Sequence, residues 1–217
     1  MPSLGLLLRL SLLGLASLIA GYVIANLWRG AQQENAIGAH AEEIFRSPTS
    51  FVAGNPDGDV SVVAFFDYNC PYCREGAPAL AKLIAADGKV RLVLKELPVL
   101  GADSEAVARV ALASIAQGKY FELYERLIGE KGRATKDKAL RIAAELGLDT
   151  GRLEKDMQGQ AVEDAIAANE ELAGSLGVRG VPFYLVGDRA VAADGDFYDQ
   201  LVANVADIRE HGCRTTC

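Results

Sequence analysis

The segment Asn69-Cys70-Pro71-Tyr72-Cys73 constrains the fold of this chain more than any other stretch, because it joins two different hydrophobic patterns. The run before it, from Val60 to Phe66, is rich in β-branched and aromatic residues, as a buried strand is. After it, apolar residues recur at helical spacing from residue 74 to residue 84. A strand, a short turn and a Cys-x-x-Cys pair that opens a helix together indicate a thiol redox site.

The spacing of the two cysteines explains the chemistry expected of them. Cys70 would stand at the N-terminus of the helix, where unpaired backbone N–H groups and the helix dipole favour a thiolate. Pro71 suits the first helical turn, where its missing N–H is not needed. Cys73 lies one turn further along, close enough to form a disulfide. We therefore expect Cys70 to exchange with a substrate and Cys73 to resolve the mixed disulfide.

Two other interpretations of this cysteine pair stay open. A structural zinc site needs four ligands, and the remaining cysteines and histidines are far away in the sequence: His40, His211, Cys213 and Cys217. An inert structural disulfide is the second alternative, although a helix N-terminus activates a thiol. The competing class of function is therefore a copper- or zinc-binding protein. We expect neither a metal site nor a cofactor, because the sequence contains no cofactor-binding motif.

An uncharged apolar run near the N-terminus bears on the cellular compartment. It extends from Leu10 to Trp28, between Arg9 and Arg29. Its length is just enough to span a bilayer and is long for the apolar part of a signal peptide. Residues 1–29 are therefore expected to be either a cleaved signal peptide or a membrane anchor. Both would export the remainder, and four cysteines suit an oxidising compartment.

Composition limits the remaining possibilities. The 217 residues are 50% hydrophobic, which is enough for one domain with a sizeable core. The net charge of −7 argues against nucleic-acid binding, which requires a basic surface. Residues 30–46 mix glutamates with apolar residues and are expected to form a helical linker that acts as a spacer. Self-association through this segment is the alternative, although it is short for a coiled coil.

The rest of the chain is predicted to form strands before and after a helical block. A short edge strand is expected at Phe51–Gly54, followed by central strands at residues 60–67 and 89–97. Helical patterns fill residues 103–176, and a final helix is expected at residues 197–209. Strand character returns before that helix, in two runs at residues 177–186 and 190–192.

Three further residues stand near the expected redox site. Asp67 and Glu96 end the two central strands, where open α/β sheets deliver active-site groups, and either could tune the cysteines. Alternatively, Asp67 caps the next helix or faces solvent, and Glu96 forms a solvent-facing pair with Lys95. Pro182 conflicts with its strand-like surroundings. It indicates an edge, a bulge or a cis peptide bond between Val181 and Pro182.

The segment from Phe65 to Cys73, followed by a helical block and then Gly180-Val181-Pro182, resembles the DsbA-like thioredoxin-fold disulfide oxidoreductases of the bacterial envelope. Residues 54–60 and 94–101 resemble the ScsC and Com1-like group within them. This resemblance covers roughly residues 45–210. It implies an α/β thioredoxin domain at residues 47–210, with an inserted all-helical subdomain at about 103–176, preceded by the signal or anchor helix.

The resemblance also implies roles for individual residues. Cys70 corresponds to the attacking cysteine, Cys73 to the buried one and Pro182 to the cis-proline beside the disulfide. Pro71, Tyr72 and Val181 would contact the substrate. The implied partners are exported client proteins with cysteines and a membrane redox partner. The implied location is the periplasm, with the chain secreted or tethered to the inner membrane.

The direction of electron flow follows less directly from the resemblance. Val181 stands where ScsC-like relatives often have threonine, and strongly oxidising members have valine there. Tyr72 replaces the histidine of the best-known oxidants. The oxidase direction is slightly favoured, and the alternative is an isomerase or reductase of the ScsC type. Some ScsC-like relatives are also connected with copper tolerance.

The C-terminal tail, residues 211–217, lies beyond the core of this family. A local disulfide between Cys213 and Cys217 is the leading expectation. A metal-binding tail that uses His211 is an alternative, since thiolates suit copper. A pair of free thiols is the third.

Overall fold

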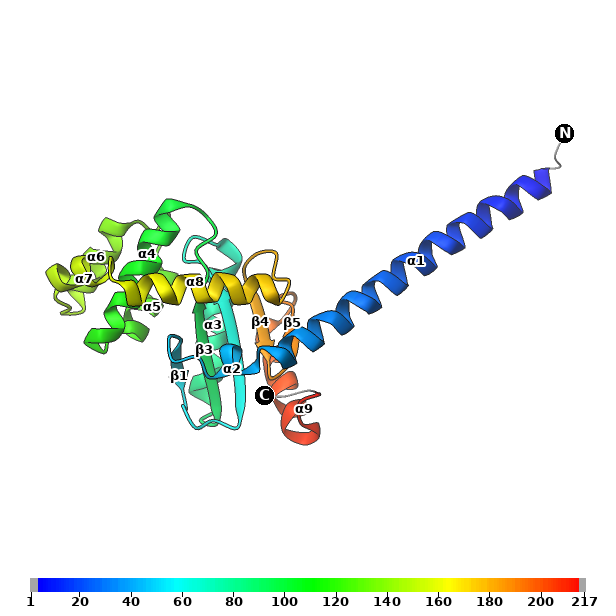
Figure 1. Cartoon of the computed structure of the whole chain (residues 1–217). Helices are drawn as coiled ribbons and strands as arrows, with labels where there is room; N and C mark the ends of the chain where they lie inside the picture. Colours follow the sequence, from blue (N-terminus) through cyan, green and yellow to red (C-terminus); the bar gives the residue numbers. More distant parts are fainter. Residues whose placement is uncertain (1–3, 215–217) are drawn as a thin grey trace.

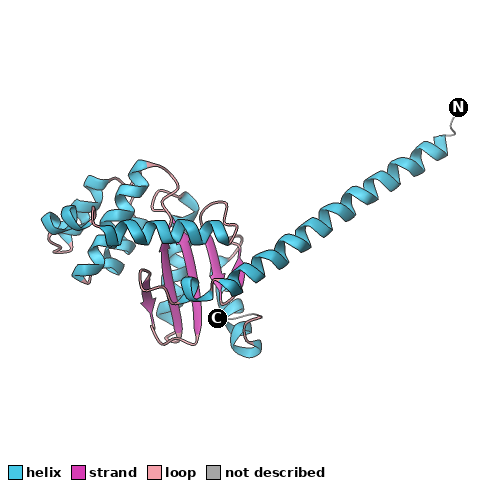
Figure 2. Cartoon of the chain, viewed as in Figure 1, coloured by secondary structure: helices cyan, strands magenta, loops and turns pink. Residues whose placement is uncertain are grey.

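A five-stranded mixed sheet forms the centre of the molecule (Figure 2). The computed structural model describes residues 4–214, and within them the side chains of residues 15, 17–28 and 30–214. The strand order is β1-β3-β2-β4-β5. β2 and β3 are parallel, and the other neighbouring strands are antiparallel. The strands are β1 (Phe51–Gly54), β2 (Val60–Phe66), β3 (Val90–Glu96), β4 (Phe183–Val186) and β5 (Arg189–Val191).

The alternation of side chains along β2 divides the core into two parts. Val62, Ala64 and Phe66 join the core on the side of α3 (Pro71–Ala86) and α9 (Phe197–His211). Val63 and Phe65 point to the opposite face. A central strand that is covered on both faces needs apolar residues at almost every position. This explains the near-continuous apolar run in the sequence.

An all-helical insertion separates β3 from β4. Figure 1 shows α4 to α7 gathered beyond one edge of the sheet and α8 crossing one of its faces. The insertion confirms the expected architecture, an α/β sheet with a helical subdomain between its two halves. Its helices are α4 (Ala102–Ala113), the 3-10 helix η1 (Ser114–Gln117), α5 (Tyr120–Ile128), α6 (Lys136–Glu145), α7 (Thr150–Asp156) and α8 (Gln160–Ser175).

The N-terminal segment is one long helix. α1 (Leu4–Ala39) passes the expected boundary at residue 29 without a break and projects away from the sheet (Figure 1). Large apolar side chains on it are exposed, among them Leu18, Tyr22 and Trp28. In the part of the chain that the structure describes, no helix is both long and apolar enough to cross a bilayer. The signal peptide or membrane anchor expected at residues 1–29 stays a prediction.

Residues 30–46 pack against the sheet instead of forming a free spacer. Ile37 at the end of α1, and Ile44 and Phe45 in α2 (Ala41–Phe45), are buried in the same core part as Val63. Lys95 of β3 fixes α2 further, because its amine donates to the Glu43 carbonyl oxygen at 2.5 Å. Cations near a helix C-terminus satisfy its unpaired carbonyls. The segment therefore belongs to the folded domain.

Candidate active site

The two cysteines occupy the turn that joins β2 to α3. Cys70 is the N-cap residue of α3, and Pro71 follows it in the first turn. The backbone N–H of Cys70 donates to the Asp67 carbonyl oxygen at 3.1 Å, which closes the turn. The backbone N–H of Cys73 donates to the Cys70 Sγ atom at 3.3 Å. Cys70 thus caps the helix with sulfur, where the helix terminus favours negative charge.

The loop before β4 provides the opposite wall of the site. The peptide bond between Val181 and Pro182 is cis, one of the alternatives expected from the sequence. Pro182 precedes β4 and so removes no hydrogen bond from the sheet. β4 pairs antiparallel with β2, with Phe183 opposite Phe65. This register brings the loop to Cys70, whose Sγ donates to the Val181 carbonyl oxygen at 3.4 Å.

Burial distinguishes the dithiol from the two residues between its sulfurs. Cys70 and Cys73 are free thiols with exposures of only 3% and 2%. Pro71 and Tyr72 face solvent. Burial, and next the adjacent Cys70 sulfur, raise the pKa of the Cys73 thiol far above its usual range. Cys73 is therefore protonated at neutral pH, as expected of the inner cysteine of an exchange pair.

Asp67 holds the turn and a neighbouring loop together. Its Oδ1 atom accepts hydrogen bonds from the Asn69 N–H at 2.7 Å and the Ser104 hydroxyl at 2.8 Å. Its Oδ2 atom accepts the Leu100 N–H at 2.9 Å. Asp67 is buried and Cys70 caps α3, so both simple alternatives for Asp67, a helix cap and a solvent-facing residue, are wrong. A tuning role for Asp67 stays a prediction.

Glu96 lies in a buried tyrosine cluster. Its Oε1 atom accepts hydrogen bonds from the Tyr68 and Tyr120 hydroxyls at 2.7 and 2.8 Å. Its Oε2 atom is buried and has no hydrogen-bond partner among the described residues. Burial raises the pKa of Glu96 to about 8, so the group is neutral at pH 7. The alternative of a solvent-facing pair with Lys95 is wrong, because both side chains are buried. A tuning role for Glu96 stays a prediction.

The C-terminal tail is described only as far as residue 214. Cys213 is disulfide-bonded, and Cys217 lies outside the described residues, so their pairing remains a prediction. His211 Nδ1 lies 3.0 Å from an Asp207 carboxylate oxygen. Within residues 4–214, no three side chains of His, Cys, Asp or Glu are grouped as a metal site requires.

Sequence reasoning did not identify several residues around this turn. Asn69 and Arg74 flank the cysteine pair, and their side chains bind the loop between α5 and α6. Val99 and Leu100 are exposed on the loop that Asp67 holds. The only sequence signal for the first two residues is their adjacency to Cys70 and Cys73. The exposure of Val99 and Leu100 depends on the path of their loop and has no such signal.

A family model described as the DSBA-like thioredoxin domain matches residues 61–206, which include both cysteines and Pro182. The chain belongs to this DsbA-like family. A solved thioredoxin-like oxidoreductase from Silicibacter pomeroyi is 44% identical to it, with a TM-score of 0.75 over 78% of this DsbA-like chain and 97% of the other. These matches confirm the expected fold and the expected class of domain, a thiol:disulfide oxidoreductase.

Two further comparisons agree with this fold and family. A linker-deletion mutant of Proteus mirabilis ScsC has the same fold, with a TM-score of 0.80 and 23% identity. The match covers 96% of the DsbA-like chain and 97% of the ScsC chain. The probable disulfide bond formation protein D of Bacillus cereus is 28% identical, and the match covers 71% of this chain and 77% of that protein. Two Na⁺/H⁺ antiporters of Salinispora species also match, and the DsbA-like chain spans only 22% of their length.

Proposed function

We propose that this chain is an exported thiol:disulfide oxidoreductase that transfers a disulfide from Cys70 and Cys73 to cysteines of client proteins. The position of the Cys70 sulfur is the observation that carries the proposal. It lies between the Cys73 N–H, at 3.3 Å, and the Val181 carbonyl, at 3.4 Å. A backbone carbonyl beside the reactive sulfur suits an extended peptide, which can pair with the loop before Pro182 as an added strand.

The disulfide transfer takes two exchange steps, both of which involve Cys70 Sγ. A client thiolate attacks Cys70 Sγ, the Cys70–Cys73 bond breaks, and Cys73 leaves with the electron pair. The raised pKa of Cys73 means that it then takes up a proton. A second client thiolate attacks the client sulfur of the mixed disulfide and releases Cys70. The client loses two electrons, and the protein gains them as a dithiol.

The oxidase direction is supported by the surroundings of Cys70. The Cys73 N–H and the Val181 carbonyl oxygen both hydrogen-bond the free Cys70 sulfur, which exists only in the reduced protein. Stabilising the reduced form makes the disulfide a stronger oxidant. To act again, the protein must pass two electrons to another redox protein. A membrane redox partner would serve in the periplasm, where the apolar N-terminal segment would direct the chain as a signal peptide.

Exposed apolar side chains near the turn support unfolded polypeptides as clients. Tyr72 is 67% exposed, Val99 51% and Leu100 43%. The Leu100 backbone is tied to Asp67, whose carbonyl oxygen binds the Cys70 N–H, so this loop lies next to the reactive turn. Folded proteins bury most of their large apolar side chains. An unfolded client can offer such side chains beside its cysteine.

The test is oxidation of a reduced, unfolded model protein that contains one native disulfide. The oxidised wild-type chain should convert one client dithiol to a disulfide for each Cys70–Cys73 pair consumed. Cys70→Ser should not. Glu145→Gln, a change on the surface of α6, should react like the wild type. Equal client oxidation by wild type and Cys70→Ser would reject the proposal. Reshuffling of a second client that has several mispaired disulfides, without net oxidation, would instead show an isomerase.

A further inference from the structure

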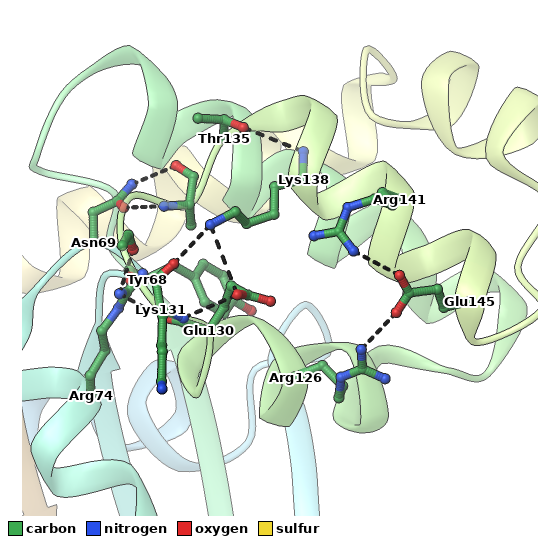
Figure 3. Close-up of polar contacts among 12 residues, drawn as sticks. Tyr68, Asn69, Arg74, Arg126, Glu130, Lys131, Thr135, Lys138, Arg141 and Glu145 are labelled. Atoms are coloured by element: carbon green, nitrogen blue, oxygen red, sulfur yellow. Dashed lines mark hydrogen bonds and ion pairs between the residues drawn. The ribbon is translucent and has the colours of Figure 1, made fainter.

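The loop between α5 and α6, residues 129–135, lies against the turn that carries the cysteines (Figure 3). Two residues of the turn reach this loop from opposite sides of the Cys-x-x-Cys pair. Asn69 precedes Cys70 directly, and Arg74 follows Cys73 directly. The helical insertion therefore binds a side chain on each side of the reactive pair, although it supplies neither sulfur.

Asn69 pairs with a single residue of the loop in both directions. Its Oδ1 atom accepts the Ala134 N–H at 2.7 Å, and its Nδ2 atom donates to the Ala134 carbonyl oxygen at 3.0 Å. The same Nδ2 atom lies 3.1 Å from the Ser104 hydroxyl oxygen. Ala134 is fully buried, so water does not compete well for these bonds. They fix both the position and the orientation of the Asn69 amide.

Arg74 binds three backbone carbonyls. Its Nε atom donates to the Tyr68 oxygen at 2.6 Å, and its Nη1 atom donates to the oxygens of Glu130 and Gly132 at 2.8 and 2.6 Å (Figure 3). Lysine could not reproduce this arrangement, because the guanidinium is planar and presents its donors in fixed directions. Arg74 thereby ties the start of the active-site turn to the loop of the insertion.

Arg74 is half-buried, and one of its donors is left unpaired. Its Nη2 atom is buried without a hydrogen-bond partner among the described residues. None of the ion pairs found within residues 4–214 includes Arg74, and its three hydrogen bonds all go to backbone carbonyl oxygens. A buried donor without a partner lowers stability. An arginine here is therefore better explained by the geometry that it imposes than by added stability.

We infer that the loop between α5 and α6 sets the redox equilibrium of the dithiol, with Asn69 and Arg74 as the positioning residues. This inference rests on the proposed function. Reduction breaks the Cys70–Cys73 bond with two electrons and leaves a Cys70 sulfur held by the Cys73 N–H and a protonated Cys73. In the oxidised form the covalent bond itself restricts the turn. The two side chains therefore stabilise the reduced form more than the oxidised form.

The test compares the equilibrium of each variant with a glutathione buffer. We expect Asn69→Ala and Arg74→Ala to shift the equilibrium about tenfold toward the disulfide form, a change of about 30 mV toward more negative potential. Arg126→Ala is the matched control. It removes the 2.7 Å ion pair with Glu145 inside the same insertion, away from the turn (Figure 3), and should leave the equilibrium unchanged.

Two further measurements separate positioning from other roles. Each substitution should lower the unfolding free energy of the reduced form more than that of the oxidised form. The difference between the two losses should equal the free-energy equivalent of the shift in the glutathione equilibrium, because the reactions form one thermodynamic cycle. Equal destabilisation of both forms, with an unchanged equilibrium, would overturn the inference and leave only a structural role. Arg74→Lys keeps the charge but not the three bonds and should resemble Arg74→Ala. Full rescue by lysine would also overturn the inference.

Failure of the proposed function would look different in the same experiment. The wild-type chain would then show no reversible dithiol couple with glutathione, and no variant could shift it. A reversible wild-type couple with unshifted variants would reject only the role of the loop.

Discussion

The Cys70 sulfur and the Val181 carbonyl oxygen lie 3.4 Å apart, although 111 residues separate them in the sequence. They meet because β4 pairs antiparallel with β2, which places the loop before Phe183 at the end of β2 where the cysteine turn begins. The whole helical insertion lies between these two strands in the chain. The reactive site is therefore complete only when both halves of the sheet have formed.

Removal of the inner cysteine should trap the exchange reaction halfway. In Cys73→Ala, mixed with a disulfide-containing model peptide, Cys70 can attack, but no second thiol of the protein releases the peptide. We expect a covalent one-to-one complex, visible by mass spectrometry and removed by a reducing agent. Cys70→Ala is the control and should form none. Equal complex formation by both variants would show that Cys70 is not the attacking sulfur.

Glu96 should make stability depend on pH. Its pKa is about 8 in the folded chain and near 4.5 when exposed, so the folded state binds more protons between these values. Stability attributable to this group therefore falls as pH rises from 4.5 to 8, by up to about 4 kcal/mol. We expect Glu96→Gln to abolish this slope. Unfolding free energies of both chains at pH 5 and pH 8 provide the measurement, and parallel changes would contradict the prediction.

Phe45 tests whether the segment before residue 47 belongs to the domain. Its ring is only 2% exposed and packs in the core part that includes Val63 and Phe65. Phe45→Ala should lower the free energy of unfolding by about 3–5 kcal/mol, because it leaves a cavity. Trp28, which is 64% exposed on α1, supplies the control, and Trp28→Ala should change stability by about 0.5 kcal/mol or less. Similar effects of both changes would contradict the observed docking.

Gly76 allows α3 to pack closely against β4. A Cβ atom at this position would collide with the Tyr184 hydroxyl and lie 3.3 Å from the Cζ atom of its ring. The Tyr184 ring is buried and packed against Phe197, so it has little freedom to move. We expect Gly76→Ala to cost about 1–3 kcal/mol. Thermal unfolding should show partial recovery when Tyr184→Phe is added, and no recovery would contradict this explanation.

Local patterns in the sequence were sufficient to predict the redox turn. The apolar run of β2, the two cysteines and the helical spacing after them all depend on neighbouring residues. Pro182 was informative for a similar reason, since a proline in a strand-like run signals unusual backbone. The thioredoxin fold, and the placement of Pro182 beside the cysteines, came instead from the resemblance to DsbA-like proteins.

Long-range contacts to the backbone could not be predicted. Asn69 and Arg74 bind carbonyl and N–H groups of residues 130–134, and every residue in a chain carries such groups. No residue type in that loop therefore marks it as a partner. For Lys95 and Glu96 the sequence left burial and solvent exposure open for another reason. A charged pair at a strand end suggests solvent, but β3 is covered on both faces, and the two side chains enter opposite parts of the core.

The docking of α1 and α2 also escaped prediction. Only a few apolar residues in residues 30–46 contact the sheet, and they are separated by alanines and glutamates. Such a sparse pattern is compatible with a linker. These residues cover one face of the sheet, and that face could be recognised only after the strands had been placed.

The reduction potential of the Cys70–Cys73 pair tests the central claim most directly. It can be measured by equilibrating the full chain with glutathione buffers and counting free thiols by mass spectrometry. We predict one reversible two-electron couple with a potential above about −220 mV, more oxidising than the cytosolic glutathione pool. A potential below about −260 mV would contradict the oxidase direction. The absence of any reversible couple would contradict the redox site itself.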